Sequence, residues 1–231
     1  MRAIEEGERS ERRGWQVGTK QVAVGQRSNG QMLAKRLVQG CFLIWILPRL
    51  LIYRLMQSLF GDRAFLGASE SIARKPGMWG VFLRQAFYGQ LLSSCGKDVY
   101  IGWGTVFSMR EASLGDQAYV GRNCNLGYAK VGQNVMLADN VVVLSGGREH
   151  STDVQAGSMH DQKQVYSEVS IGDGAWIGAG AIIMANVGRE CIIGAGAVVN
   201  KPIADGAVAV GVPAKVVKYR EGYGEIADVR N

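Results

Sequence analysis

The sequence predicts an all-β solenoid preceded by an N-terminal helical segment. Two observations predict the solenoid. A six-residue pattern recurs along the second half of the chain, and Gly accounts for 32 of 231 residues while Pro accounts for only 4. Abundant Gly with little Pro and no Gly-X-Y period excludes collagen and indicates tight turns at regular intervals. A third observation, an apolar stretch at residues 37–60, predicts the helical segment.

Residues 1–36 are expected to form a disordered basic leader. They are rich in Arg, Glu, Gln and Gly and show no apolar periodicity. Four glutamates within the first eleven residues argue against a signal peptide. Met32 opens a more structured stretch and is an alternative start of the chain.

The apolar stretch favours a helix at a membrane interface over a helix that spans a bilayer. Its longest uncharged run, 37–48, has 12 residues, whereas a spanning helix needs about 20. Arg49 and Arg54 interrupt the remainder, and Pro48 is expected to kink the helix. Trp45 suits headgroup depth, and the arginines can snorkel. The alternative is a helix that packs on the protein's own core or on a sister subunit.

Charge separates the first part of the chain from the repeat. Residues 1–90 carry 14 Lys/Arg against 6 Asp/Glu, whereas residues 91–231 carry 12 against 14. Local basic charge predicts contact with an anionic surface. The mixed segment 61–95 contains a second helix near 78–93, which completes a helical or membrane-interfacial region at 37–95. Basic residues among aromatics also suit nucleic acid, but no binding module is present, so no nucleic-acid partner is expected.

The repeat occupies residues 96–220 and consists of an aliphatic residue, usually Gly, two polar or small residues, a small residue and a free position. Each unit supplies one short strand and one turn, and the aliphatic side chain points inward. Gly is expected to take positive φ. Three units close a triangular coil of about 18 residues, which gives four to five coils. Nine units fit, and their aliphatic residues are Ile101, Leu114, Val120, Val131, Leu137, Ile171, Ile177, Val187 and Ile193.

The repeat breaks between residues 144 and 170, and both histidines of the chain, His150 and His160, lie in this loop. Loops that leave a rigid scaffold commonly carry ligand-binding side chains. The four cysteines lie far apart, without the spacing of a zinc site, and are expected to be buried thiols. No metal site is expected.

At these residues the chain resembles the hexapeptide-repeat acetyltransferases, whose fold is a left-handed parallel β-helix. The resemblance is most specific at 173–178 (DGAWIG) and 209–217 (AVGVPAKVV), and 183–188 (IMANVG) is similar to the sugar-modifying branch. The chain is most similar to bacterial polysaccharide O-acetyltransferases and to galactoside and maltose acetyltransferases. The resemblance implies a homotrimer that binds acetyl-CoA in clefts between subunits.

The resemblance assigns the catalytic base to His150, which would take the proton from an acceptor hydroxyl as its oxygen attacks the thioester. A neutral imidazole near pH 7 suits this task. Glu149 or Asp153 would orient the imidazole. Related loops often carry a second histidine where this chain has Arg148, and His160 is expected to be a solvated loop residue.

The resemblance also places the acetyl-CoA site. The backbone N–H of Ala179 would stabilise the thioester oxyanion, and Trp176 would wall the cleft or else stack between coils. Lysines offer point charges to the phosphates of CoA. The remaining contacts are assigned to Ala195, Asn200, Lys201, Lys215 and Lys218.

These residues predict an acetyl-CoA-dependent O-acetyltransferase that modifies a sugar or a nascent or lipid-linked polysaccharide. It would be cytoplasmic and peripheral at the inner membrane face through 37–60, with 221–231 as a C-terminal tail. Alternatives are an N-acetyltransferase of an amino-sugar nucleotide or another small acceptor, and a non-catalytic assembly subunit. A γ-class carbonic anhydrase would need three histidine ligands, and this chain has two histidines in all.

Overall fold

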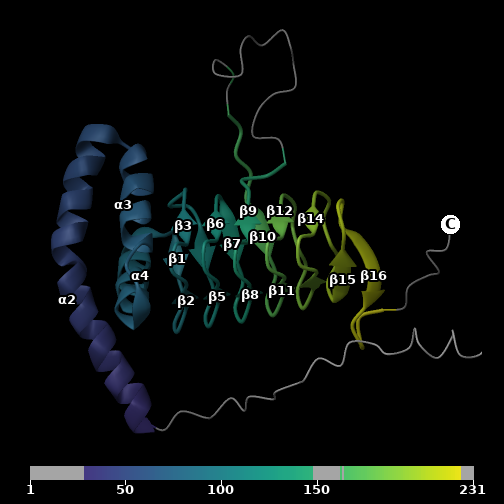
Figure 1. Ribbon diagram of the computed structural model, residues 1–231, viewed down its shortest axis with the longest axis horizontal. Coiled ribbons are helices and arrows are strands. Elements are labelled where there is room, and N and C mark those ends of the chain that lie inside the picture. The colour runs from purple at the N-terminus through teal and green to yellow at the C-terminus, as the bar shows by residue number, and fades with distance from the viewer. Residues whose placement is uncertain (1–28, 148–161, 163, 225–231) are drawn as a thin grey trace, which may run out of the picture. The chain divides into compact units, whose positions relative to one another are not determined.

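The computed structural model describes residues 29–147, 162 and 164–224 of the chain (Figure 1). Internal contacts divide the chain into residues 1–36 and 37–231, and the fold described below lies in the second unit. Most of the expected leader lies outside the described residues. Helix α2 (Asn29–Phe60) nevertheless begins eight residues before the end of the segment that was expected to be disordered.

Three helices precede the solenoid: α2, α3 (Arg63–Ala73) and α4 (Gly77–Leu91). Helix α4 confirms the helix expected near 78–93. Helix α2 continues through Pro48, and its segment Lys35–Phe60 is long and apolar enough to cross a membrane. By length and composition, the helix is therefore long enough to span a bilayer, whereas the sequence predicted it to be too short. The difference arises because the prediction ended the apolar run at Arg49 and Arg54. A buried core helix or an N-terminal signal would meet the same criterion.

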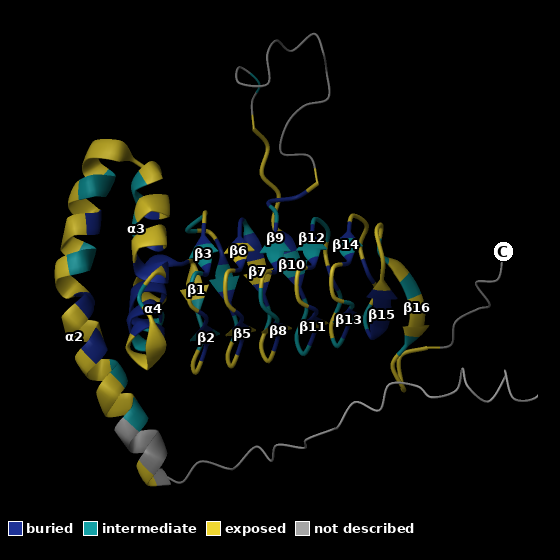
Figure 2. Cartoon of the chain, in the orientation of Figure 1, coloured by how far each residue is buried: buried dark blue, intermediate teal, exposed yellow. Residues whose placement is uncertain are grey.

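One stripe of α2 packs on the two shorter helices. Phe42, Ile46 and Tyr53 are buried, and the ring of Phe42 lies 4.7 Å from that of Trp79 on α4 in an edge-to-face arrangement. The ring of Tyr53 lies 6.5 Å from that of Phe65 on α3. From Leu37 to Phe60, the opposite side of α2 is exposed (Figure 2). Packing on the protein's own core thus accounts for one stripe of the helix only.

Helices α3 and α4 close the N-terminal end of the solenoid through a buried polar network. The guanidinium of Arg84 donates from Nε to the carbonyl of Ile101 at 2.8 Å and from Nη1 to the carbonyl of Lys75 at 2.7 Å. The Ser69 hydroxyl lies 2.8 Å from that of Tyr88 and accepts from the N–H of Phe107 at 3.0 Å. Burial raises the pKa of Tyr88, so this phenol stays protonated and can hydrogen-bond.

The solenoid has three faces, each a sheet whose strands pair in parallel except the last strand of the chain, which pairs antiparallel with the strand before it. Face A contains β1 (Ser94–Cys95), β4 (Ser113–Leu114), β7 (Ala129–Val131) and β10 (Val169–Ile171). Face B contains β2 (Tyr100–Ile101), β5 (Tyr119–Val120), β8 (Met136–Leu137), β11 (Trp176–Ile177), β13 (Ile192–Ile193), β15 (Ala207–Val210) and β16 (Lys215–Tyr219). Face C contains β3 (Val106–Phe107), β6 (Asn125–Leu126), β9 (Val142–Val143), β12 (Ile182–Ile183) and β14 (Val198–Val199).

These strands form about five turns, as the repeat predicted, and β16 closes the C-terminal end antiparallel to β15 (Figure 1). The aliphatic residue of every unit is buried, and so is the small residue four positions later. The interior of the prism is therefore a continuous stack of Ile, Leu, Val and Ala. Cys124 and Cys191 belong to this core, whereas Cys41 is exposed, contrary to the expectation that all four thiols are buried.

Glycine has two roles in the six-residue pattern, and the positive φ expected of the glycine directly after the aliphatic residue lies at another position. The residue three positions after each aliphatic residue has positive φ, as in Gly104 (+78°) and Asn123 (+53°). The glycine directly after the aliphatic residue is needed for space instead. A Cβ on Gly102 would lie 2.4 Å from the carbonyl oxygen of Gly121, and one on Gly172 would lie 2.5 Å from the nitrogen of Arg189.

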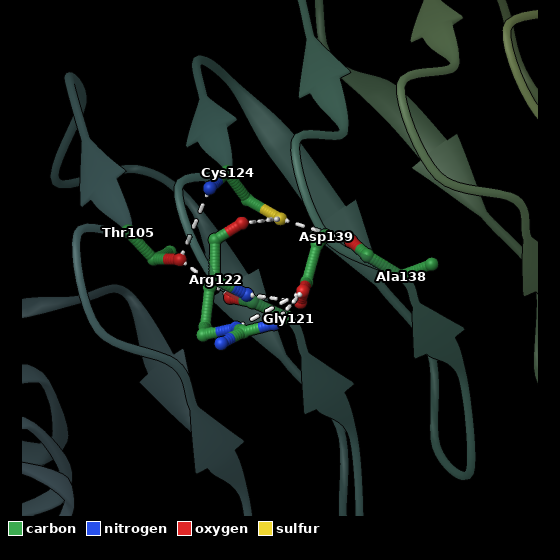
Figure 3. Close-up of polar contacts among 6 residues, drawn as sticks. All are labelled: Thr105, Gly121, Arg122, Cys124, Ala138 and Asp139. Atoms are coloured by element: carbon green, nitrogen blue, oxygen red, sulfur yellow. Dashed lines mark hydrogen bonds and ion pairs between the residues drawn. The ribbon is translucent and has the colours of Figure 1, made fainter. Parts of the chain in front are cut away.

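Side chains in the turns join one coil to the next (Figure 3). The Oδ1 atom of Asp139 accepts from the backbone N–H of Arg122 at 2.7 Å, and its Oδ2 atom forms an ion pair with the guanidinium of Arg122 at 2.7 Å. The Thr105 hydroxyl donates to the carbonyl of Gly121 at 2.6 Å and accepts from the N–H of Cys124 at 3.1 Å. These contacts serve the stacking of the coils, and no nucleophile is activated among them.

Candidate active site

The loop expected to carry the catalytic base leaves the solenoid where the sequence predicted. Strand β9 ends at Val143 and β10 begins at Val169, so the interruption separates the third and fourth coils at the corner between faces C and A (Figure 1). The two legs of the loop are joined by a hydrogen bond from the N–H of Ser167 to the carbonyl of Ser145 at 2.8 Å. His150 and Glu149 lie outside the described residues, as do Arg148, Asp153 and His160.

Ala179 and Ala195 lie in exposed turns at the corner between faces B and C. They occupy neighbouring coils, and the carbonyl of Ala179 accepts from the N–H of Gly196 at 2.9 Å. Within the part of the chain that the structure describes, the N–H groups of Ala179 and Ala195 donate to no acceptor. Two coils before Ala179 on this corner, Arg122 donates its N–H to a carboxylate. The two alanine turns carry no such side chain, so their N–H groups are available to a ligand.

Trp176 lies on face B, where its strand β11 pairs with β8 and β13. Its side chain is 52% exposed and follows Tyr119 and Met136 in an outward-facing apolar row. In the described residues its indole has no aromatic ring partner, which does not support stacking between coils. Face B thus presents a strip of exposed apolar surface beside the Ala179 turn.

The predicted phosphate-binding residues lie near the C-terminal end of the solenoid. Asn200 and Lys201 follow β14 at the corner between faces C and A, two coils beyond the loop, a separation of about 10 Å at about 4.8 Å per coil. Lys215 and Lys218 are exposed on β16. Among the described residues these three lysines form no ion pair, whereas neighbouring Arg189 and Arg220 pair with Asp205 and Glu190. Their charge is therefore open to an anion.

One protomer does not bring these predicted residues together. The alanine turns lie at the corner between faces B and C, while the loop leaves at the corner between faces C and A. Clusters of three metal-ligating side chains are absent from the part of the chain that the structure describes. The predicted residues thus form two groups on different edges of the prism.

Two cavities were not predicted from the sequence. A polar pocket of about 600 Å³ lies on face A and includes Arg110, Tyr128, Lys130 and Glu168, the last directly before β10. The Nε atom of Arg110 is buried and has no hydrogen-bond partner among the described residues. A second, mostly apolar groove of about 690 Å³ lies between α2 and α3. No periodic pattern predicts either cavity, because each is lined by residues from separate elements.

Comparison with known proteins places this architecture among acetyltransferases. Residues 168–201 match the family model described as bacterial transferase hexapeptide (six repeats). A galactoside O-acetyltransferase of Lactococcus lactis is 31% identical over 58% of this chain and 58% of its own length. The chain spans about half the length of the curated relatives that it matches.

Solved structures agree with this assignment. The maltose O-acetyltransferase from Clostridium difficile 630 superposes with a TM-score of 0.61 at 29% identity, over 71% of this chain and 89% of that one. A galactoside acetyltransferase in complex with coenzyme A superposes with a TM-score of 0.57 at 22% identity, over 69% and 82% of the two chains, and shows the same fold. In its coils, turns and repeat pattern the chain is similar to the hexapeptide-repeat transferases, whose acetyltransferases have the left-handed β-helix.

Proposed function

We propose that this protein is an acetyl-CoA-dependent O-acetyltransferase that acts on a hydroxyl group of a sugar. The observation that carries the proposal is the match to nearly the whole of a maltose O-acetyltransferase at 29% identity. The available N–H groups at Ala179 and Ala195 and the unpaired lysines of the last coils support a donor site for the thioester and phosphates of acetyl-CoA.

In the proposed reaction, the imidazole of His150 removes the proton from the acceptor hydroxyl as its oxygen attacks the thioester carbonyl carbon. The N–H of Ala179 donates to the carbonyl oxygen while negative charge develops on it. The carbon–sulfur bond then breaks, and the imidazolium returns its proton to the departing thiolate. Acetyl ester and free CoA result, and Glu149 holds the imidazole in position.

A homotrimer is part of this proposal. The loop and the alanine turns lie on different edges of one prism, so a second copy is needed to bring an imidazole to a donor site. The exposed apolar row on face B, with Trp176 at 52% and Met136 at 53% exposure, suits burial against a neighbouring subunit. CoA would then bind in the cleft between subunits.

The acceptor is proposed to be a sugar hydroxyl, in free, nascent or lipid-linked form. The pocket on face A supports this choice, because its serine, tyrosine, arginine, lysine and carboxylate groups can exchange hydrogen bonds with a polyhydroxylated ligand. The basic, apolar segment 37–60 would hold the protein at the cytoplasmic face of a membrane, close to a lipid-linked acceptor. Support comes from the exposed apolar side of α2.

The experiment is the replacement His150→Ala in the full chain, with acetyl transfer to a panel of sugars followed by mass spectrometry. We expect turnover to fall by about a thousandfold, within the range typical of general bases. Binding of acetyl-CoA, measured by calorimetry, should remain. His160→Ala is the matched control and should keep full activity. Transfer to serine or to an amino group instead would replace the sugar as the proposed acceptor. Unchanged turnover in His150→Ala would exclude His150 as the catalytic base.

A further inference from the structure

The groove between α2 and α3 has a size and a lining that suit the binding of a small molecule. Its walls are largely apolar, with Ile52, Met56 and Phe60 from α2 and Ala64, Ala68 and Ile72 from α3. Its volume of about 690 Å³ falls in the range of small-molecule sites, about 300–1,000 Å³. Ile52 and Phe60 are 60% and 62% exposed, so the groove opens at the protein surface.

Two positive charges lie in this apolar lining. Arg49 from α2 and Arg63 from α3 both line the groove, and no aspartate or glutamate does. Within the described residues neither arginine forms an ion pair. Guanidinium groups that border an apolar cavity are matched by a ligand with a hydrocarbon body and a phosphate head.

Tyr53 adds a second, independent sign of a ligand. Its side chain lines the groove and is only 3% exposed, yet its buried hydroxyl has no hydrogen-bond partner in the part of the chain that the structure describes. A buried hydroxyl without a partner destabilises the folded protein. A polar atom of a bound amphiphile would relieve that destabilisation.

The residues around the groove indicate that the ligand comes from a membrane. Leu51, Leu55 and Leu59 form a stripe of α2 beside the groove and are 72%, 58% and 65% exposed. This unpartnered apolar stripe continues the open wall of the groove. Across residues 37–92, six Lys/Arg face two Asp/Glu. Apolar exposure with an excess of positive charge is the pattern of a helix that lies in the surface of an anionic bilayer.

We propose that the groove between α2 and α3 binds one acyl chain of an anionic phospholipid, with Arg49 and Arg63 on its phosphate. The inference rests on the membrane contact suggested above and makes it specific. Adsorption of the leucine stripe to a membrane surface would not require a cavity. In the proposed site, by contrast, the groove binds one acyl chain of a single lipid. The attachment is therefore selective for phospholipids whose head group carries a net negative charge.

The test uses the full chain on phosphatidylcholine vesicles that contain a phosphatidylglycerol with a photoreactive diazirine at the end of one acyl chain. Peptide mapping after illumination should place the label on segments of 49–72. Gly67→Leu fills the groove, and a Cβ at Gly67 meets no atom within 4 Å, so the fold should tolerate it. We expect the groove label to fall by at least about tenfold.

Gly40→Leu is the matched control, because Gly40 is another helical glycine with open space around its Cβ and does not line the groove. Its label should be unchanged. Arg49→Gln with Arg63→Gln should lower partition into anionic vesicles about thirtyfold, since each arginine near such a surface contributes about a factor of five. Arg54→Gln with Arg74→Gln should lower partition similarly but leave the label on the groove.

Three results would overturn the site: an undiminished groove label in Gly67→Leu, equal labelling by a diazirine phosphatidylcholine, or a stable second copy of the chain covering the groove in solution. The first two leave membrane contact intact if the wild type still binds vesicles. Acetyl transfer to a soluble sugar without vesicles reports the proposed enzyme activity separately, so failure of the lipid site and failure of the enzyme can be distinguished.

Discussion

The solenoid and the helical region differ in how far their apolar side chains are buried. In the solenoid, the aliphatic residue of each unit points inward and is almost fully buried, as at Ile101 and Ile177. On α2, one apolar stripe packs inside and another, including Leu51 and Leu55, remains exposed. A repeat that stacks on itself satisfies its own apolar surface, whereas a single helix on the end of the stack has a face left over. The difference separates the region of the proposed group transfer from the region of the proposed membrane attachment.

The two regions meet at Arg84, and breaking this junction should have the largest effect on stability. Arg84→Met keeps the side-chain bulk but removes the donors to the carbonyls of Ile101 and Lys75. One buried and one partly buried carbonyl without a donor should cost about 3 kcal/mol of unfolding free energy. Urea denaturation measures the loss, and hydrogen exchange should show faster opening of α3 and α4.

Arg54→Met is the control for this junction, because Arg54 is exposed on α2. Its stability should match that of the wild type. A loss in Arg84→Met no larger than in this control would mean that the carbonyls find other donors, and that the helices are joined to the solenoid by apolar packing alone.

A second prediction applies one substitution to both regions. Gly172→Ala places a Cβ 2.5 Å from the nitrogen of Arg189 in the next coil and should destabilise the protein by about 2 kcal/mol. Gly40→Ala in α2 meets no atom within 4 Å and should stabilise it by about 1 kcal/mol through helix propensity. Thermal denaturation of the two variants measures both signs. Equal effects would show that coil spacing does not explain the glycine after each aliphatic residue.

These glycines also show how far the sequence predicts the fold. A local pattern with a fixed period gave the strands, the inward residues and the position of the loop, because each unit repeats the same environment. The reason for Gly172 was missed, since the clash involves Arg189, seventeen residues away. The helix expected over 37–60 is present, and α2 continues through Pro48, where the sequence predicted a kink.

The candidate site was less predictable than the fold. Ala179 and Ala195 could be chosen by resemblance, but nothing in their own chemistry marks them, because the useful group is a backbone N–H. The groove with Arg49, Arg63 and Tyr53 depends on how two helices pair, which no spacing in one segment encodes. The partner subunit that the proposed active site requires leaves no periodic signal either.

The smallest expected effect concerns the turn contacts between coils and their dependence on pH. Hydrogen bonds from Arg122, chiefly from its side chain, hold the pKa of Asp139 below its usual value. A depressed carboxyl pKa stabilises the fold above the unfolded pKa of about 3.9, and this contribution is lost as the pH falls through the lower folded pKa. Asp139→Asn keeps the acceptor for the Arg122 N–H but removes the charge, so it should lower the melting temperature slightly at about pH 7.

That decrease should shrink as the pH falls below about 4, because the wild-type carboxyl becomes neutral as well. Asp173→Asn is the matched control: its Oδ1 accepts the N–H of Gln133 at 2.8 Å in an equivalent turn, but its side-chain partner is an amide. The pair in Figure 3 is mostly exposed, with the Arg122 side chain at 65%, so solvent screens it and the effect stays small. A pH-independent difference between the two variants would assign the role of Asp139 to its hydrogen bond rather than to its charge. The ion pair with Arg122 would then not contribute to stacking of the coils.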